Sequence, residues 1–398
     1  MQGKRFIQTL RLQNLLSYGS EGKAIALEPL NVLIGPNASG KSNLIEAIGL
    51  LRAMPKDIAA AVREGGGIGE WLWKGGRENP VAEIEAVVDY SEGQMPLRYQ
   101  ICFTMVGQRL EVVNETIAEV NRQGDVYFAY EDESTAVLNP SVYDPETNTR
   151  IEGDKYLYKG TSLKRDQSIL SQIKAPVQYP QLAYLGNQFS NMRLYRSWTM
   201  GLAAETRKPQ PADMPTDFLE EDASNLGLVL NDLEHHGVKS LVIDQLKKFY
   251  GAASDITIKI YGNTVQIYIR EQGLGQPIPA NRLSDGTLRY LCLLAVLCHP
   301  TPPPLICIEE PELGLHPDIL PTIAELLLEA SQRTQLIVTT HSADLVSALT
   351  PESVLVCERD ESKGSRLRRL EPELLEEWLK DFSLGSLWRM GEIGGTRW

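Results

Sequence analysis

The sequence predicts an α/β fold with a mostly parallel core sheet, an antiparallel β lobe and an inserted helical lobe. Three observations support this fold class. An apolar strand at 30–34 leads into a Gly-rich turn and then into a helix with apolar residues at helical spacing. Two further apolar runs, at 305–308 and 335–340, have the continuous hydrophobicity of buried parallel strands. Segments of alternating polar and apolar residues between 81 and 130 predict an antiparallel meander.

The Gly-rich turn has the sequence Gly-Pro-Asn-Ala-Ser-Gly-Lys-Ser and matches a P-loop. In such a loop the glycines let the backbone curl, so that successive N–H groups and the helix N-terminus point at one polyphosphate. We expect Lys41 to meet the β- and γ-phosphates and Ser42 to ligate Mg²⁺. The residues expected to bind ATP here are Gly35, Pro36, Asn37, Ala38, Ser39, Gly40, Lys41, Ser42 and Asn43.

Length and composition bound the class of protein. A chain of 398 residues can hold one large domain or two to three lobes around a sizeable core. No apolar run reaches the length of a membrane span, and the N-terminus leads into an alternating strand rather than a signal peptide. We therefore expect a cytoplasmic protein without a membrane partner. The five cysteines are scattered and suggest neither a disulfide framework nor a zinc site.

The formal net charge of -13 argues against a protein whose whole surface coats nucleic acid. A local basic face stays possible. Its candidate positions are sparse, and each could equally be a solvated surface charge: Arg193, Arg196, Arg207 and Lys208.

The remaining elements follow in chain order. Residues 5–12 and 23–27 predict a hairpin before the P-loop strand, and 216–250 has helical spacing that predicts the inserted lobe. A strand pair at 256–260 and 265–269 precedes a second half in which strands and helices alternate. The expected division is a P-loop lobe with the meander at 1–160, a helical insertion at 161–250 and a C-terminal lobe at 251–398.

Two acids, Glu309 and Glu310, end the apolar run at 305–308. A buried parallel strand that delivers carboxylates to a sheet's C-terminal edge should have this pattern. In a Walker B strand the first acid supports Mg²⁺ and the second orients or deprotonates the attacking water. The same pair could be a solvated turn, but the presence of a P-loop in the same chain favours the interpretation as a Walker B strand.

Two further sites complete the pattern. His341 follows the apolar run at 335–340, and a histidine at the tip of a parallel strand can reach a γ-phosphate at that edge. Ser284 and Gly286 precede an apolar helix, where a hydroxyl and backbone N–H groups can form an anion site. An ordinary N-cap explains Ser284 equally well in isolation, so the order of the motifs decides.

The motifs follow one another in the order P-loop, long insertion, Leu-Ser-Asp-Gly-Thr, Ile-Glu-Glu-Pro-Glu-Leu-Gly-Leu-His-Pro and Thr-Thr-His-Ser. This series resembles the motifs of ABC-type ATPases of the RecF/SMC branch. The resemblance is strongest to the predicted ATPases labelled AAA-21 or AAA-15, relatives of the overcoming-lysogenization-defect (OLD) proteins. It covers about the first fifty residues and those from 284 to 350, and the tail at 388–398 is also similar to that group. It implies an ABC-type P-loop ATPase head that uses ATP and Mg²⁺.

The resemblance also implies a role for each matching residue. Glu310 would be the catalytic carboxylate and His341 the switch histidine. Ser284 and Gly286 would be the signature, contacting the γ-phosphate bound by the other protomer of a head-to-tail dimer that sandwiches two ATP molecules. A Q-loop glutamine that contacts Mg²⁺ and nucleotide should follow a strand in the middle region, and Gln188 is the candidate.

The sequence departs from the wider superfamily at several points. Glu309 stands where aspartate is usual, so its longer arm could move the Mg²⁺ water shell and slow turnover. The signature lacks the common Gly-Gly-Gln ending. We expect no counterpart of the C-terminal Toprim nuclease of OLD proteins in this chain, and the roughly 240 residues between Ser42 and Ser284 are far more than ABC transporters have.

These observations predict a slow ATPase in which Lys41 offsets phosphate charge and Glu310 positions water. We expect it to dimerise on ATP and to regulate a separately encoded nuclease or toxin in bacterial defence against phage. One alternative is a RecF-like DNA-repair ATPase that clamps DNA across the closed heads. Another is an ATP-gated scaffold that hydrolyses weakly.

Overall fold

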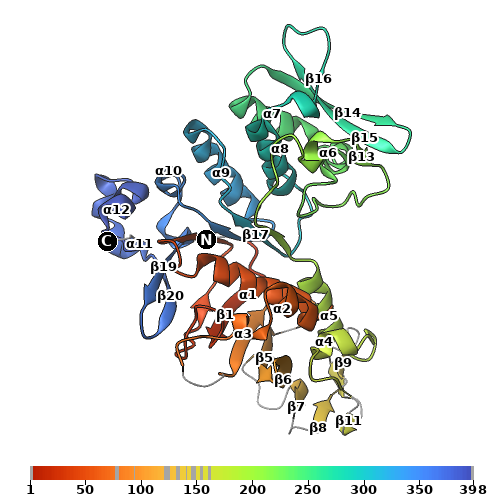
Figure 1. The fold of residues 1–398 in the computed structure, drawn as a ribbon, viewed down its shortest axis with the longest axis vertical. Helices are drawn as coiled ribbons and strands as arrows, with labels where there is room; N and C mark the ends of the chain where they lie inside the picture. The colour runs from red at the N-terminus through yellow and green to blue at the C-terminus, as the bar shows by residue number, and fades with distance from the viewer. Residues whose placement is uncertain are drawn as a thin grey trace.

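The computed structural model describes residues 3–76, 80–93, 95–120, 126–130, 135–139, 141–144, 149–152, 156–159 and 163–395. Along the long axis of the molecule, a central sheet separates an antiparallel sheet from a lobe of helices and short strands (Figure 1). The expected α/β architecture, with its antiparallel lobe and mostly parallel core sheet, is confirmed.

The core sheet has six strands in the order β12-β17-β18-β3-β19-β20, and only β20 runs antiparallel to its neighbour. Every residue of β3 and β18 is buried, as expected for strands covered on both faces. The strands are β12 (Arg193–Tyr195), β17 (Leu305–Glu309), β18 (Gln335–Thr339), β3 (Leu30–Ile34), β19 (Val354–Asp360) and β20 (Gly364–Arg369).

The antiparallel sheet contains the predicted N-terminal hairpin and meander. Strands β4, β5 and β6 alternate buried and partly exposed residues along much of their length, which gives the sheet one core-facing side. In sheet order its strands are β11 (Tyr156–Lys159), β8 (Thr135–Leu138), β7 (Val126–Tyr130), β6 (Arg109–Glu119), β5 (Leu97–Val106), β4 (Ala82–Val88), β1 (Ile7–Gln13) and β2 (Ile25–Ala26). Strands β9 (Ser141–Asp144) and β10 (Thr149–Glu152) form a separate pair.

One hydrophobic core joins the two sheets through helices that carry apolar residues at helical spacing. The core includes Leu44, Ile48 and Leu51 of the helix after the P-loop, together with residues of both sheets. The helices on this side are α1 (Lys41–Ala53), α2 (Ile58–Glu64), α3 (Ile68–Trp71), α4 (Ile169–Gln172) and α5 (Pro180–Ser190).

A second core covers the opposite face of the core sheet and continues into the upper lobe. The lobe pairs the predicted strand hairpin, β14 (Ala253–Tyr261) and β15 (Thr264–Glu271), with three helices (Figure 1). The helices around this core are α6 (Leu226–His235), α7 (Lys239–Phe249), α8 (Asp285–Leu297) and α9 (Leu320–Ala330), and short elements are β13 (Gln210–Pro211), β16 (Ile278–Pro279), η1 (Glu205–Arg207), η2 (Ala280–Arg282) and η3 (Pro317–Ile319).

The middle of the chain is more divided than a single helical insertion. Helices α6 and α7 supply the expected helical part, but they pack with the strands that follow them. Helix α5 instead contributes to the core around α1, and β12 pairs with β17 as an edge strand of the core sheet. The division at 160 and 250 therefore stays a prediction.

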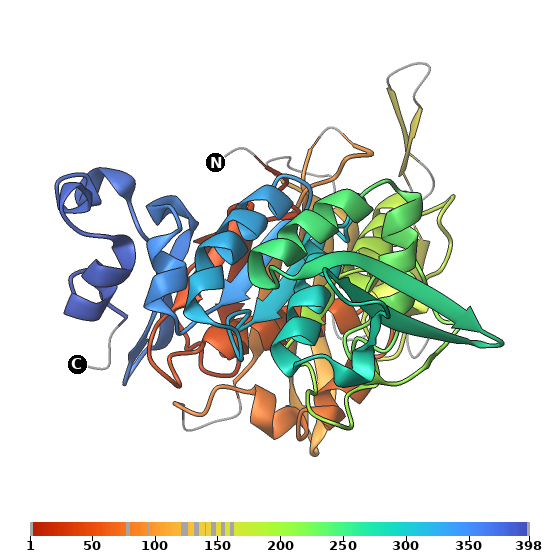
Figure 2. The same ribbon diagram turned by 90° about the horizontal axis from the view of Figure 1, so that it is seen from above.

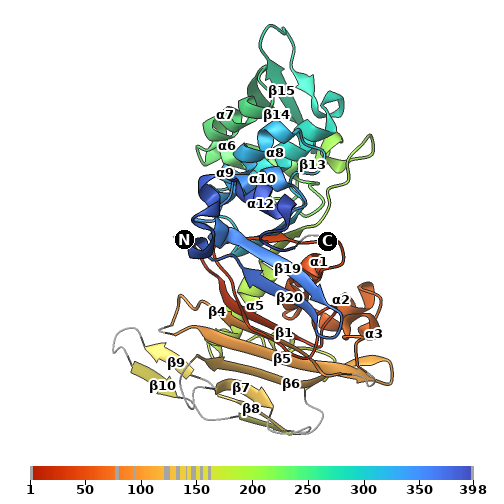
Figure 3. The same cartoon turned by 90° about the vertical axis from the view of Figure 1, so that its left-hand side faces the viewer.

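The C-terminal region packs beside the core sheet and forms a third hydrophobic core with β3 and β19. Figures 1 and 2 show these blue helices at one side of the molecule, and Figure 3 looks onto that side. The elements are α10 (Ala343–Ser347), α11 (Pro372–Leu375), α12 (Leu384–Met390), η4 (Pro351–Ser353) and η5 (Trp378–Lys380). Among the described helices, none combines the length and apolar character required to cross a bilayer.

A buried carboxylate ties the antiparallel sheet to the start of α4. Glu115 on β6 has no exposed surface, and its oxygens accept hydrogen bonds from Tyr99 Oη at 2.8 Å, Ser168 Oγ at 2.5 Å and the Ile169 N–H at 2.8 Å. Burial raises the pKa of Glu115 to about 7, although these hydrogen bonds oppose the shift. The native state therefore holds a proton at Glu115 that the unfolded chain releases.

We expect the stability conferred by this proton to be lost as pH rises from about 5 to about 7.5, because the folded pKa lies above the unfolded value. Relative to Glu115→Gln, the free energy of unfolding of the wild type should fall by roughly 3 kcal/mol over this interval. Urea unfolding of both proteins across the pH range measures the difference. Glu111→Gln, on the same strand, is the control, and a pH-independent difference would contradict the assignment.

Candidate nucleotide-binding site

The candidate site lies at the edge of the core sheet where the parallel strands end. The hydrogen-bond register aligns Glu309 with Thr339 and Thr339 with Leu33. Glu310, His341 and the P-loop follow these three positions in the chain. The structure therefore brings the expected P-loop, Walker B and switch residues to one edge, as predicted for open α/β sheets.

The P-loop connects β3 to α1 in a conformation that requires glycine at two positions. Gly40 has φ +109°, and a Cβ there would lie 2.2 Å from Ser365 Oγ. Gly35 has φ +149°, and a Cβ there would lie 2.2 Å from the Cys357 carbonyl oxygen. The loop is thus packed directly against β19 and β20, which leaves no room for a side chain at either position.

Lys41, the first residue of α1, is folded across this loop. Its Nζ donates to the carbonyl oxygens of Gly35 at 2.8 Å and Pro36 at 3.0 Å, and the residue is only 6% exposed. Burial lowers the Lys41 pKa, while the nearby Glu309 and Glu310 partly oppose this shift. The ammonium group is therefore placed in the cradle where a polyphosphate would lie.

Ser42 and Glu309 form the part of the site that suits a hard cation. Ser42 Oγ donates to Glu309 Oε2 at 3.0 Å. Burial raises the pKa of Glu309, and the Ser42 hydrogen bond opposes that shift. No cluster of three or more His, Cys, Asp or Glu ligands occurs in the part of the chain that the structure describes. This small oxygen donor set fits Mg²⁺ bound together with a nucleotide's phosphates better than a cation held by protein alone.

Glu310 and His341 face each other beside the P-loop. Glu310 has φ +48°, an uncommon conformation for a non-glycine residue, and its N–H donates to Thr339 O at 2.9 Å. Glu310 Oε1 lies 3.8 Å from His341 Nε2, and both side chains are about two-fifths exposed. A strained backbone that presents an acid next to a histidine is typical of a functional site.

Glu312 is a residue of the site that the sequence did not single out. Its Oε1 accepts hydrogen bonds from Thr340 Oγ1 at 2.6 Å and from the His341 N–H at 2.9 Å. It thereby ties the turn after β17 to the end of β18 and fixes the position of His341. Nothing in the sequence distinguishes this carboxylate from a surface acid, because its partners follow a different strand.

Ser284 and Gly286 lie at the start of α8. Ser284 caps α8, and its Oγ accepts from the Thr287 N–H at 3.0 Å. A Cβ at Gly286 would lie 3.1 Å from the Gly314 carbonyl oxygen, so the start of α8 packs on the loop that follows Glu310. Figures 1 and 3 both show α8 in the upper lobe and α1 in the lower half of the molecule.

Arg207 holds the loop before α8 and is not the solvated surface charge that the sequence allowed. Its side chain is 9% exposed and pairs with Asp285, and its Nη1 donates to Leu283 O at 2.7 Å. The hydrogen bond from Arg207 lowers the pKa of Asp285. The sequence could not predict this contact, because Arg207 and Asp285 lie in segments that are far apart along the chain.

Gln188 differs from its expected position. It lies within helix α5 and not in a loop that follows a strand. The strand of this region that pairs with β17 is β12, and the residue that follows it is Arg196. Arg196 lies near Glu309, with 3.6 Å between Nε and Oε1. Helical periodicity could not reveal this three-residue edge strand.

The C-terminal segment contributes a wall beside the P-loop. A pocket of about 410 Å³ is lined by Gly35 to Asn37, His341, Trp388, Arg389 and Gly395, among others. The Gly395 N–H donates to Glu358 Oε1 at 3.2 Å, and Trp388 Nε1 donates to Gly395 O at 3.0 Å. The last residues of the tail, 396–398, lie outside the described part of the chain.

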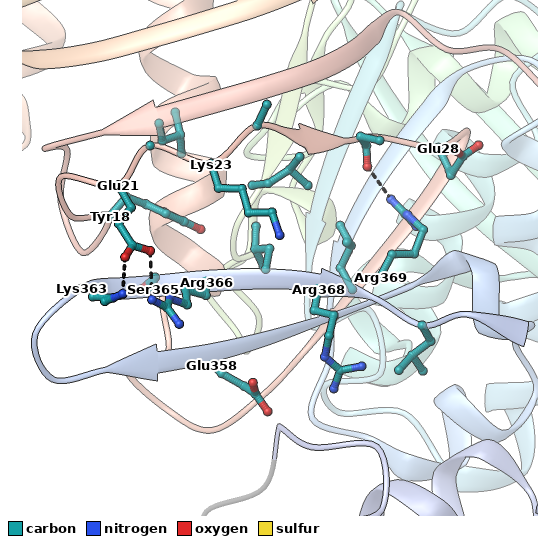
Figure 4. Close-up of a pocket in the computed structure, with 18 of the residues that line it drawn as sticks. Tyr18, Glu21, Lys23, Glu28, Glu358, Lys363, Ser365, Arg366, Arg368 and Arg369 are labelled. Carbon is teal, nitrogen blue, oxygen red and sulfur yellow. Dashed lines mark hydrogen bonds and ion pairs between the residues drawn. The ribbon is translucent and has the colours of Figure 1, made fainter. Parts of the chain in front are cut away.

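A larger cavity of about 800 Å³ lies between the β1–β2 region and the β19–β20 hairpin (Figure 4). Among its charged side chains, Glu21 pairs with Lys363 and, at 2.9 Å, with Arg366, while Arg369 donates to Ala26 O at 3.0 Å. The P-loop residues do not line it. Its mixed charge gives no continuous basic surface for nucleic acid.

The fold and this arrangement of motifs define an ABC-type ATPase head of the RecF/SMC type. The chain belongs to the AAA-domain family AAA_21, described as "putative AbiEii toxin, Type IV TA system", whose profile matches residues 30–103 and 125–347. The C-terminal wall of the P-loop pocket lies beyond this match.

A curated relative and two solved structures are similar to the chain. The DNA replication and repair protein RecF of Limosilactobacillus fermentum is 37% identical over 107 residues, which are 27% of this chain and 25% of that protein. The match thus spans a quarter of the relative's length. An SMC head bound to the C-terminal winged-helix domain of ScpA covers 93% of this chain and 99% of its own, with TM-score 0.55 and 15% identity. An SMC head from Pyrococcus furiosus with an extended coiled coil, bound to the C-terminal domain of ScpA, covers 94% and 99%, with TM-score 0.54 and 13% identity. These structural matches show a shared fold.

The contact between the C-terminal segment and the P-loop is testable with Gly395→Ala. Gly395 has φ +68°, and a Cβ there would lie 3.0 Å from Val356 Cγ1 and 3.4 Å from Gly35 Cα. The left-handed backbone should cost the alanine about 1 kcal/mol. Overpacking by the added Cβ should destabilise the variant by a further 1–3 kcal/mol, roughly. Urea unfolding measures the total loss in the free energy of unfolding. Gly237→Ala, at φ +73° with open space around its Cβ, is the control, and equal losses would contradict the packing role.

Proposed function

We propose that this protein binds and hydrolyses ATP at the edge of the core sheet. The observation that carries the proposal is the convergence of Lys41, Ser42, Glu309, Glu310 and His341 from three strand ends. In this proposal Lys41 and the P-loop N–H groups bind the phosphates. Glu310 orients or deprotonates the attacking water, and His341 contacts the terminal phosphate.

Ser42 and Glu309 would hold Mg²⁺, which when bound supplies charge neutralisation for the phosphates. The chain's own contribution is to keep both oxygens in place: the Ser42–Glu309 hydrogen bond sets their separation, and the register of β17 sets the height of Glu309 at the sheet edge. Glutamate at this position supports the proposal of slow turnover, because its longer side chain reaches further into the site than aspartate would.

We propose further that two copies close head to tail on ATP. The separation of α8 from α1 within one chain supports this, because Ser284 and Gly286 then need a second copy to reach a phosphate. The anchoring of Asp285 by Arg207 and the packing of Gly286 against Gly314 would keep the signature rigid for that contact. Binding energy from two enclosed nucleotides is the source of closure.

The proposed biological role is to regulate a separately encoded nuclease or toxin in defence against phage. Its support is the family description, which names a toxin and a toxin–antitoxin system. This support is association with a family and not a feature of the site. Affinity purification from the native host before and after phage challenge tests it, and the absence of any stable partner in both samples would count against it.

A RecF-like role on DNA is a second candidate, favoured by the relative named as a DNA replication and repair protein. Salt-sensitive DNA binding that requires ATP would support it, and no binding at low salt would exclude it. The basic residues predicted for such a face give it little support, because Arg207 is engaged with Asp285 and Arg196 lies near Glu309.

The rate of ATP hydrolysis distinguishes a weakly hydrolysing scaffold, the third candidate, from an ATPase. If the protein is an ATP-gated scaffold, Glu310→Gln should leave an already negligible rate almost unchanged. If it is an ATPase that uses Glu310, the same variant should lose about 100-fold or more in kcat.

ATP binding itself is tested with Lys41→Ala. Loss of the buried ammonium group removes charge-assisted hydrogen bonds to phosphate, so the affinity for Mg²⁺-ATP should fall by at least about 10-fold. Isothermal titration calorimetry measures the affinity. Lys74→Ala, which removes an exposed lysine paired with Glu70, should bind as the wild type does. Equal affinity of Lys41→Ala and wild type would refute the site.

Dimerisation is tested in the Glu310→Gln background, where slow hydrolysis should trap the closed state. Mass measurement by light scattering should show a dimer with ATP and a monomer without it. Adding Ser284→Arg should abolish the dimer while leaving ATP binding intact, because Ser284 caps α8 and is not part of the P-loop. A Glu310→Gln protein that saturates with ATP and stays monomeric would show the dimer proposal to be wrong.

A further inference from the structure

Arg196 lies where the core sheet delivers its edge strand to the site. Strand β12 runs parallel to β17, and the register aligns Tyr195 with Ile308. The next residues in the chain are Arg196, directly after β12, and Glu309, the last residue of β17, so the two side chains start at the same level of the sheet edge. Backbone pairing, and not chance surface proximity, brings the guanidinium to this position.

The guanidinium lies between two carboxylates of the site. Arg196 Nε is 3.6 Å from Glu309 Oε1, and its Nη1 is 3.4 Å from Oε1 of Glu46 on α1. The other oxygen of Glu309 accepts from Ser42. Glu309 therefore connects the arginine directly to the hydroxyl that stands in the P-loop.

These contacts hold Arg196 loosely. Both distances exceed those of a well-formed charge-assisted hydrogen bond, and the side chain is 45% exposed. A half-exposed ion pair of this kind contributes little to stability. Arg196 is thus near the site, charged, and free to turn toward a stronger anion.

We propose that Arg196 contacts the terminal phosphate of the nucleotide bound in its own chain. This inference rests on the proposed ATP site and adds a residue to it. Lys41 and the P-loop N–H groups lie on the α1 side of the cradle, whereas Arg196 starts level with Glu309, beside the acids that act on the terminal phosphate. Its planar guanidinium can bind two phosphate oxygens at once, which an ammonium group cannot.

Glu46 and Glu309 both compete with this contact. Both carboxylates attract Arg196 as the structure shows it, and a triphosphate with its greater negative charge would compete for the same guanidinium. The arginine would then exchange its carboxylate partners for phosphate oxygens. Glu46→Gln, which removes one competing partner without touching the P-loop motif, should leave nucleotide affinity unchanged or raise it by a few fold.

The test compares a nucleotide that has a terminal phosphate with one that lacks it. Affinities for the non-hydrolysable analogue AMP-PNP and for ADP, each with Mg²⁺, are measured by calorimetry for wild type, Arg196→Ala and Arg196→Lys. Arg196→Ala should bind AMP-PNP about 10-fold or more weakly and ADP within about 3-fold of wild type. Arg196→Lys should be intermediate, because it keeps the charge and loses the paired contact.

Arg366→Ala, which removes an exposed arginine paired with Glu21, is the matched control and should change neither affinity. An unchanged AMP-PNP to ADP ratio in Arg196→Ala would overturn the inference and leave Arg196 as a surface ion pair. Equal weakening of both nucleotides would overturn it as well, since it would indicate general positioning. Failure of the wild type to bind either nucleotide would instead refute the proposed function.

Discussion

Strand β3 is the element on which the rest of the structure depends. Three consecutive residues, Val32, Leu33 and Ile34, belong to three different hydrophobic cores: the upper core, the core shared with the antiparallel sheet, and the C-terminal core. All three side chains are fully buried. Because a register slip would exchange the faces of this strand, the packing fixes its position relative to β18 and β19. The P-loop starts at the next residue, Gly35.

Register then builds the site from segments that are distant in the chain. The parallel pairing of β12, β17, β18 and β3 aligns their ends, so each strand presents the residues after it at one edge. The inserted segments contribute through anchors of their own: Arg207 holds the start of α8, and Glu312 ties the turn after β17 to His341. The residues of the site that directly follow the strand ends are therefore held as rigidly as the sheet itself. A half-exposed side chain such as Arg196, which follows the edge strand β12, is less constrained.

The sequence predicted those parts of the site whose signal is local. The P-loop, Glu309, Glu310 and His341 each stand directly after an apolar run, so pattern and position agree. Gln188 was placed by analogy with a strand that the sequence did not reveal, since β12 has only three residues and lies between a helix and an irregular segment. The contacts made by Arg196, Arg207 and Glu312 join segments that are far apart in sequence. No periodic pattern along the chain predicts such contacts.

The positive charges of the site are already engaged within the chain, which bears on how a nucleotide could act there. Lys41 donates to two P-loop carbonyls, and Arg196 lies between Glu309 and Glu46. A triphosphate would replace these partners, so only the difference between the two sets of contacts counts toward affinity. Glu310 and His341 are placed by backbone geometry and need no such exchange. Nucleotide binding should therefore rearrange Lys41 and Arg196 and leave Glu310 and His341 in place. Because Gly286 packs on the loop that follows Glu310, the rigid side of the site is also the side connected to the signature.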